Sequence, residues 1–243
     1  MWADRAEWIG VDESRLAHPD YGALCRGFTP GDRYPDVVVE ADVGGWLARS
    51  VDATTGRGRD VVVDVTGSQP WLANAAAERL VAAGYEVDVM AVTWSLPQSR
   101  LAVLDRADWE QRTGSLVRPI IPGEHREGLE AMGGVVEGLA VPESGVARVS
   151  VHRPGEASPT VVQSWDRGFD QAGLVAAIEG ERSRPWTRAE SVRFGEVYER
   201  LSGSLGPEFT GLLDGVARDG QTLGHRVLVG SRPGPAVGLE LGR

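Results

Sequence analysis

Carboxylate, hydroxyl and guanidinium side chains stand where apolar runs of this 243-residue sequence end. Asp12 ends the first run and is followed at helical spacing by Arg15, while Asp64 and Thr66 end the second run. If the runs are parallel strands, these ends share the sheet edge at which open α/β folds bind ligands. A carboxylate there is suited to be the general base for a hydroxyl nucleophile. The alternative is that both carboxylates cap the segments that follow them.

Two arginines, Arg106 and Arg118, follow the third apolar run. Guanidinium groups bind phosphate oxygens bidentately and stabilise the charge that develops in phosphoryl transfer. The alternative is the commoner one, arginines on a solvated helix face. All 25 basic residues are arginine, and the phosphate-loop motif G-x-x-x-x-G-K-[ST] does not occur within the 243 residues.

The composition limits the size of the core and the kinds of partner that the protein can have. A hydrophobic content of 42% is enough for one core of ordinary size plus an appendage. The net charge of -10 repels polyphosphate backbones and argues against a nucleic-acid partner. No run approaches the ~18 apolar residues of a membrane span, and the first residues have no apolar signal core. We therefore predict a cytoplasmic protein without a membrane partner.

Cysteine and histidine offer little chemistry. Cys25 is the single cysteine, which excludes an internal disulfide, and we expect a small buried side chain. The four histidines show no metal-ligand spacing, so no metal site is predicted. No serine stands in a G-x-S-x-G elbow, which leaves a hydrolase triad without a nucleophile. The histidines are His18, His125, His152 and His225.

Apolar periodicity predicts the elements that must position these groups. Short Val/Ile-rich runs alternate with helical patterns, which is typical of a parallel sheet covered by helices on both faces. Pro70 suits the first turn of a helix and Gly84 its end. The predicted strands span Glu7–Asp12, Asp60–Thr66, Tyr85–Thr93 and Val146–His152, and the predicted helices span Pro70–Ala83, Pro97–Arg112 and Gly123–Gly138.

The character of the chain changes after Arg153-Pro154-Gly155, where strand signals nearly vanish. Thr187 and Glu190 form a capping-box pattern that starts a helix. We predict a sheet domain over residues 1–155 and a helical extension with a tail over residues 156–243. The helices predicted in the extension span Gln171–Arg184, Arg188–Leu205 and Pro207–Arg218.

Five short pieces between Trp8 and Gln163 together resemble the zeta toxin family of bacterial toxin–antitoxin systems. Each is weak alone, but all five occur in the family's order. They are Val11–Arg15 followed by His18-Pro19-Asp20-Tyr21, then Val63–Gly67, then Ala83–Val87, then Ser99 with Arg106, and last Arg118 with His125.

The resemblance implies a P-loop-kinase-like three-layer fold that uses ATP and Mg²⁺ to phosphorylate UDP-N-acetylglucosamine, with an antitoxin as partner. It implies that Asp12 takes the proton from the sugar 3-hydroxyl and that Arg106 and Arg118 neutralise the transferring phosphoryl group. Arg15, Asp64 and Thr66 would bind the sugar nucleotide. The family's sugar-contacting carboxylate has no obvious counterpart: Trp46 lies near its expected place, with Glu40 and Asp42 further back.

The chain departs from the family at its start. Family members begin with a strand, the phosphate loop and a helix, all of which precede the segment matched by Trp8–Asp12. We therefore expect an inactive, truncated chain, from a misplaced start codon or a decayed gene, with a phosphate loop encoded within about 60 codons upstream. The absent strand would lie between those of Asp64 and Val89 and leave two unpaired edges. Alternatively, Arg226–Val229 and the Gly-rich turn after it are the family's first strand and phosphate loop, permuted to the C-terminus. Val237 then stands where the loop's lysine belongs.

Three functions stay open from the sequence. The first is a zeta-toxin-like sugar-nucleotide kinase, inactive as presented. The second is a non-catalytic remnant that binds a sugar nucleotide or an antitoxin. The third is another small-molecule kinase, such as one that acts on antibiotics.

Overall fold

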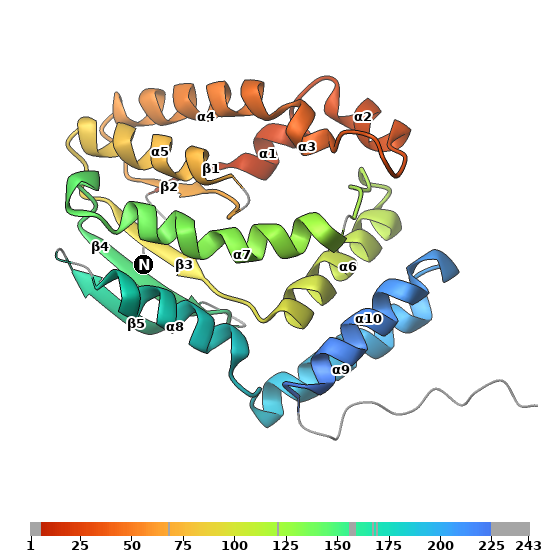
Figure 1. Cartoon of the computed structure of the whole chain (residues 1–243). Helices are drawn as coiled ribbons and strands as arrows, with labels where there is room; N and C mark the ends of the chain where they lie inside the picture. Colours follow the sequence, from red (N-terminus) through yellow and green to blue (C-terminus); the bar gives the residue numbers. More distant parts are fainter. Residues whose placement is uncertain are drawn as a thin grey trace, which may run out of the picture.

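The computed structural model describes residues 6–67, 69–120, 122–155, 159–166, 168 and 170–224. It is an α/β fold whose elements follow one another as in Figure 1. The strands are β1 (Glu7–Gly10), β2 (Val61–Asp64), β3 (Asp88–Val92), β4 (Arg148–Arg153) and β5 (Thr160–Asp166). The helices are α1 (Val11–Leu16), α2 (Tyr21–Gly27), α3 (Pro35–Val38), α4 (Glu40–Thr55), α5 (Pro70–Ala82), α6 (Leu96–Thr113), α7 (Pro122–Leu139), α8 (Gln171–Ser183), α9 (Arg188–Ser204) and α10 (Thr210–Gln221), with 3₁₀ turns η1 (Pro142–Ser144) and η2 (Pro207–Phe209). The permuted strand considered at Arg226–Val229 and the histidine at 225 lie outside the described residues.

All four predicted strands are confirmed, and both pairs among them are parallel. β1 pairs with β2 and β3 pairs with β4, as consecutive strand–helix–strand units require. β5 was not predicted. It runs antiparallel to β4 at the edge of the sheet, and all but one of its residues are exposed, so it lacks the alternation that identifies a half-buried strand. β5 lies beyond residue 155, and the domain boundary there stays a prediction.

The strands form two sheets, ordered β1-β2 and β3-β4-β5. Helix α5 connects β2 to β3, but no described strand pairs with the facing edge of either one. Apolar side chains on these two strands are exposed: Val62 on β2 is 37% exposed and Met90 on β3 is 58% exposed. The break between the two sheets therefore lies between the strands of Asp64 and Val89, where the family resemblance implies it.

One apolar core nevertheless joins the two sheets. It contains side chains from β1, β3 and β4 together with those of the helices around them. Figure 1 shows α4 and α5 beside β1 and β2, α7 crossing between the sheets, and α8 against β4 and β5. In α4, Gly44 lets Trp71 approach, since a Cβ at Gly44 would lie 2.2 Å from the indole ring. The best-buried core members are Val11, Tyr21, Val39, Val43, Val51, Leu72, Ala140, Val146, Val149, Val151, Leu174 and Ile178.

The three predicted C-terminal helices are confirmed. α9 and α10 pack with α6 around a second cluster, whereas α8 packs in the first core through Leu174 and Ile178. The capping box is present at the start of α9: Glu190 N donates to Thr187 Oγ1 at 3.2 Å, and Thr187 N donates to Glu190 Oε2 at 2.7 Å. Within the described part of the chain, no helix combines the length and apolar composition of a membrane span. The second cluster consists of Leu101, Leu104, Trp186, Phe194, Leu201, Leu213 and Val216.

Candidate functional site

Asp12 lies in the first turn of α1, directly after β1, and two arginines hold its carboxylate. Arg15 Nη1 donates to Oδ1 at 2.8 Å, and Arg118 Nη1 donates to Oδ2 at 2.6 Å. Burial raises the pKa of Asp12, but the charges of Arg118, Arg15 and Arg106 outweigh it and lower the pKa below its ordinary value. Asp12 is therefore an anion at neutral pH, and 42% of its side chain faces solvent.

Asp64 is the second carboxylate at this edge. It ends β2 opposite Gly10, two residues before Asp12. Burial and the negative charges of Asp12 and Glu13 raise its pKa. Two neighbouring carboxylates whose pKa values shift in opposite directions are a common arrangement at acid–base sites. The structure thus brings the two predicted carboxylates together.

Thr66 follows β2 in a half-buried loop, where its carbonyl accepts from Gln69 N at 3.4 Å. The next residue, Gly67, lies directly against α7: a Cβ there would lie 2.8 Å from the carbonyl oxygen of Gly128. The absence of a side chain at Gly67 therefore lets the loop after β2 pack directly against α7.

Arg118 reaches Asp12 because its loop folds back on α6. Gly114 ends that helix with φ +68°, a conformation that glycine adopts at no steric cost. Glu110, which is 4% exposed, accepts from Arg118 N at 3.1 Å and from Arg118 Nε at 2.9 Å. Arg106 Nε lies 3.5 Å from the same carboxylate, so Glu110 holds both predicted arginines. Sequence reasoning missed Glu110, although its position four residues after Arg106 was a signal.

Arg15 is 3% exposed, and its guanidinium contacts protein groups. Beside Asp12, it pairs with Asp36 Oδ2 at 3.2 Å and donates to Gln69 Oε1 at 2.7 Å. Tyr21 donates to Asp36 Oδ1 at 2.6 Å, and burial together with the Asp36 charge raises the pKa of Tyr21. These contacts fix the orientation of Asp12. Neither Asp36 nor Gln69 carries a motif that would have identified it in the sequence.

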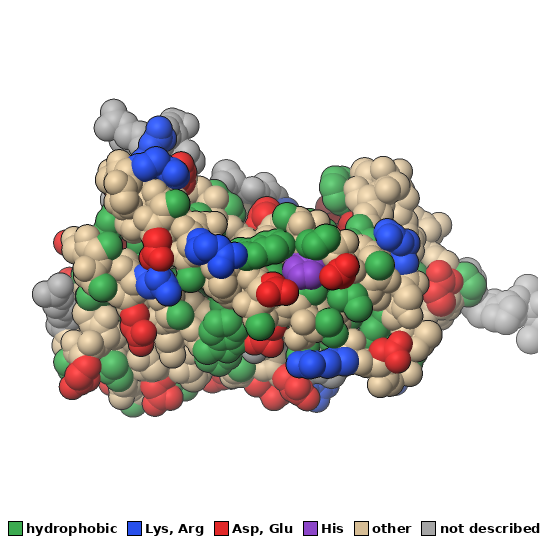
Figure 2. Space-filling model, turned by 90° about the horizontal axis from the view of Figure 1, so that it is seen from above, with side chains coloured by type: hydrophobic (Ala, Val, Ile, Leu, Met, Phe, Trp, Pro, Cys, Tyr) green, Lys and Arg blue, Asp and Glu red, His purple; other side chains and the backbone are tan. Residues whose placement is uncertain are grey.

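The other residues singled out nearby already have protein partners. The His18 ring stacks on Trp46 with centroids 5.4 Å apart, and its Nε2 lies 3.3 Å from Asp42 Oδ2. Glu40 Oε1 accepts from the Trp71 indole at 2.5 Å. Figure 2 shows this face from above, with a histidine among acidic and apolar side chains. Cys25 is buried, as predicted, and burial raises the pKa of its thiol.

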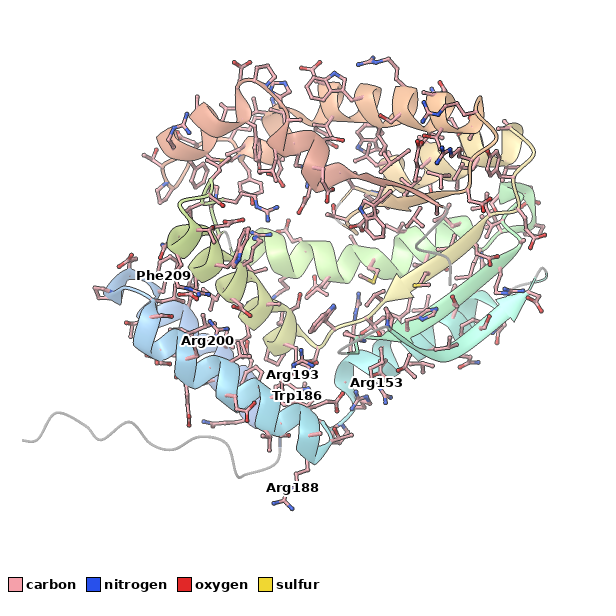
Figure 3. The ribbon with its side chains drawn as sticks, turned by 180° about the vertical axis from the view of Figure 1, so that it is seen from behind. Arg153, Trp186, Arg188, Arg193, Arg200 and Phe209 are labelled. Atoms are coloured by element: carbon pink, nitrogen blue, oxygen red, sulfur yellow. The ribbon has the colours of Figure 1, made fainter. Side chains whose placement is uncertain are left out.

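The described residues form two cavities, and the larger one borders the site. The larger, about 680 Å³, lies where α2, the loop after α6 and η2 meet, and Arg118 forms part of its wall. The smaller, about 210 Å³, lies at the carboxyl ends of β3 and β4. There Glu181 accepts from Arg153 Nε and from Arg184 Nε, each at 2.6 Å. In Figure 3, Arg153 and Trp186 lie at one end of the α9–α10 hairpin and Phe209 at the other.

Comparison with known proteins identifies the family. The sequence model of the zeta toxin family matches residues 6–159. The fold is similar to a chain from a structural study of the PezAT chromosomal toxin–antitoxin system of Streptococcus pneumoniae, with TM-score 0.63, 16% identity, and coverage of 83% of this chain and 76% of that one. No curated protein sequence matches the chain. Because the family match covers more than half of its residues, the protein belongs to the zeta toxin family.

Proposed function

We propose that the crevice at Asp12 is the acceptor side of a kinase site, and that its acceptor is the 3-hydroxyl of UDP-N-acetylglucosamine or a related sugar nucleotide. The observation that supports this most directly is the clamp of Arg15 and Arg118 on Asp12, beside Asp64 at the sheet edge. It unites an ionised carboxylate with guanidinium groups that suit phosphate. The acceptor itself is proposed from family membership.

In this proposal Asp12 accepts the proton of the attacking hydroxyl, and Arg118 and Arg106 neutralise the phosphoryl group. Asp12 and a phosphate group compete for the same Arg118 guanidinium. When a phosphate-bearing ligand takes over that guanidinium, Asp12 loses the partner that lowers its pKa and becomes a stronger base. Glu110 keeps the Arg118 backbone and Nε in place meanwhile. Arg15, held by Asp36 and Gln69, orients Asp12, and Asp64 and Thr66 line the edge at which the sugar would bind.

ATP and Mg²⁺ are the donor and metal that the family implies, and the described residues fit them only in part. Arg106 and Arg118 suit phosphate oxygens. The 243 residues contain neither a lysine nor the phosphate-loop motif, and no three His, Cys, Asp or Glu side chains among the described residues gather as metal ligands would. No step of the proposal is therefore assigned to the donor or the metal.

An antitoxin is the proposed protein partner, because the similar solved chain comes from a study of a toxin–antitoxin pair. A non-catalytic binding module is the second candidate function, since the arginines and carboxylates at Asp12 suit a sugar nucleotide whether or not phosphate is transferred. Both candidates place a sugar nucleotide in the same crevice. They differ in whether phosphate is transferred.

The two candidates are separated by a binding titration and a turnover assay on the same protein. Calorimetry with UDP-N-acetylglucosamine should show binding that Arg118→Ala weakens and Asp12→Asn does not. Mass spectrometry after incubation with ATP and Mg²⁺ then reports the 3-phosphorylated product. Product would establish the kinase, and binding without product would establish that these 243 residues act by themselves as a binding module. No binding by the unsubstituted protein would refute the sugar-nucleotide assignment in both forms.

A further inference from the structure

The cavity of about 680 Å³ is built from three segments that are distant in sequence. The end of α2 forms one wall, the loop over residues 114–120 forms the second, and η2 with the start of α10 forms the third. Small-molecule sites have volumes of roughly 300–1,000 Å³, so the cavity has the capacity of a nucleotide-sized ligand. Its third wall lies beyond the family match, which covers residues 6–159.

Two guanidinium groups give the cavity a positive wall. Arg118 lines it and at the same time pairs with Asp12, so the cavity adjoins the candidate base. Arg26 also lines it, is exposed, and has no carboxylate within ion-pairing distance among the described residues. Phosphate oxygens are the ligand groups that two arginines at one wall suit best. Glu208 on the third wall supplies an acceptor for hydroxyl groups.

Two phenylalanines give the cavity apolar walls from different elements. Phe28 follows α2. Its ring packs edge-to-face with the ring of Tyr34, and the two ring centroids are 6.1 Å apart. Tyr34 is fixed in turn, because its hydroxyl donates to the Pro119 carbonyl oxygen at 3.2 Å. Phe209 ends η2 and is half-buried against the second apolar cluster. Figure 3 shows it on the C-terminal hairpin, at the end remote from Trp186. Aromatic walls beside guanidinium groups suit a ligand that combines a ring with phosphate.

We propose that this cavity binds the nucleoside end of the acceptor nucleotide, with Arg26 and Arg118 on its phosphates and Phe28 and Phe209 against its ring. Phe209 is then a specificity-determining residue, and the C-terminal helices form part of the acceptor site. The identity of the nucleotide rests on the proposed function. The placement of a phosphate-bearing ring ligand rests on the cavity alone.

The test compares Phe209→Ala with Leu205→Ala. Both side chains are partly buried against the same apolar cluster, but only Phe209 lines the cavity. Affinities are measured by calorimetry for UDP-N-acetylglucosamine, UMP and AMP, and for tripolyphosphate, which has no ring. We expect Phe209→Ala to weaken UDP-N-acetylglucosamine and UMP about tenfold or more and to leave tripolyphosphate unchanged. Leu205→Ala should change none of these affinities, Phe209→Tyr should restore them, and Arg26→Ala should weaken all the phosphate ligands.

Several results would overturn the inference. Equal losses in Phe209→Ala and Leu205→Ala would show a structural role only. Tighter binding of AMP than of UMP would remove the assignment to the acceptor, and no binding of any probe would remove the site. If UDP-N-acetylglucosamine binds independently of Phe209, the inference fails while the proposed function stands. If binding depends on Phe209 but no phosphoryl transfer occurs with ATP, the inference stands and these 243 residues act by themselves as a binding module.

Discussion

Arg118 Nη1 lies 2.6 Å from Asp12 Oδ2, although 106 residues separate the two positions. The Arg118 side chain is 12% exposed, so solvent screens this ion pair less than one on the surface. Glu110 binds the same guanidinium at Nε, which places Arg118 between two carboxylates. The general base and the phosphate-binding arginine that family membership suggests are thus in direct contact.

Arg118→Ala should raise the pKa of Asp12, because the substitution removes the strongest contribution that lowers it. The lowered pKa stabilises the fold above the pKa of the unfolded chain, and this contribution is lost as the pH falls through the folded-state pKa. Carboxyl-carbon NMR titration of Asp12 measures the change. Arg148→Ala, which removes an exposed arginine paired with Asp88 and Asp166, is the control. An unchanged Asp12 titration in Arg118→Ala would contradict the clamp.

The 243-residue polypeptide by itself should not phosphorylate UDP-N-acetylglucosamine above background. Its sequence has no lysine and no phosphate-loop motif to hold the γ-phosphate. Mass spectrometry for the 3-phosphorylated sugar nucleotide, after incubation with ATP and Mg²⁺, checks this expectation. ATP-dependent product from this polypeptide would show that arginines replace the loop.

In any form of the protein that turns over, Asp12→Asn should lower kcat by ~10² or more and leave sugar-nucleotide affinity nearly unchanged. A general base acts mainly in the transition state, so its loss affects kcat far more than binding. Steady-state kinetics and calorimetry measure the two quantities. Asp52→Asn, which alters an exposed carboxylate on α4, is the control. If Asp12→Asn keeps normal turnover, Asp64 with its raised pKa becomes the candidate base.

Glu190→Gln should destabilise the protein at neutral pH. It should also weaken the pH dependence of the free energy of unfolding between about pH 2 and 4.5. Hydrogen bonds from Arg184 outweigh burial and, with those from Thr187, lower the pKa of Glu190 to about 2. A lowered folded-state pKa stabilises the fold above the unfolded value and loses that effect as the pH falls through the folded value. The contribution is smaller than the ~1.4 kcal/mol per pKa unit of an unscreened group, because solvent reaches this partly exposed carboxylate. Urea denaturation across this pH range, with exposed Glu199→Gln as control, measures it, and parallel curves for both variants would contradict the assignment.

Leu201→Ala should reduce the free energy of unfolding by about 2–5 kcal/mol, the usual cost of a cavity at a buried leucine. Leu201 is 0% exposed in the cluster that joins α9 and α10 to α6. Val192→Ala on the same helix removes a side chain that is 40% exposed and should cost far less. Thermal denaturation compares them. Similar midpoints for both variants would mean that the C-terminal helices pack only loosely on α6.

Local signals in the sequence were enough to predict most of the helices and strands and the resemblance to the zeta toxin family. The apolar runs gave β1 to β4, and the Thr187–Glu190 pattern gave the start of α9, because these signals act within a few residues. β5 was not predicted because the strand is almost wholly exposed. α4 was not predicted because Gly44 and Gly45, which have low helix propensity, lie within it.

Only the tertiary structure decided how the site residues meet. The sequence places Asp12 and Asp64 at strand ends, and parallel pairing brings them to one edge. That Arg118 pairs with Asp12 depends on the turn at Gly114 and on Glu110, and long-range contacts of this kind leave no periodic signal. The cavity wall at Phe209 arises in the same way, because it forms only when the C-terminal hairpin packs on α6. Distances between segments are set by packing of the whole core, which no local pattern encodes.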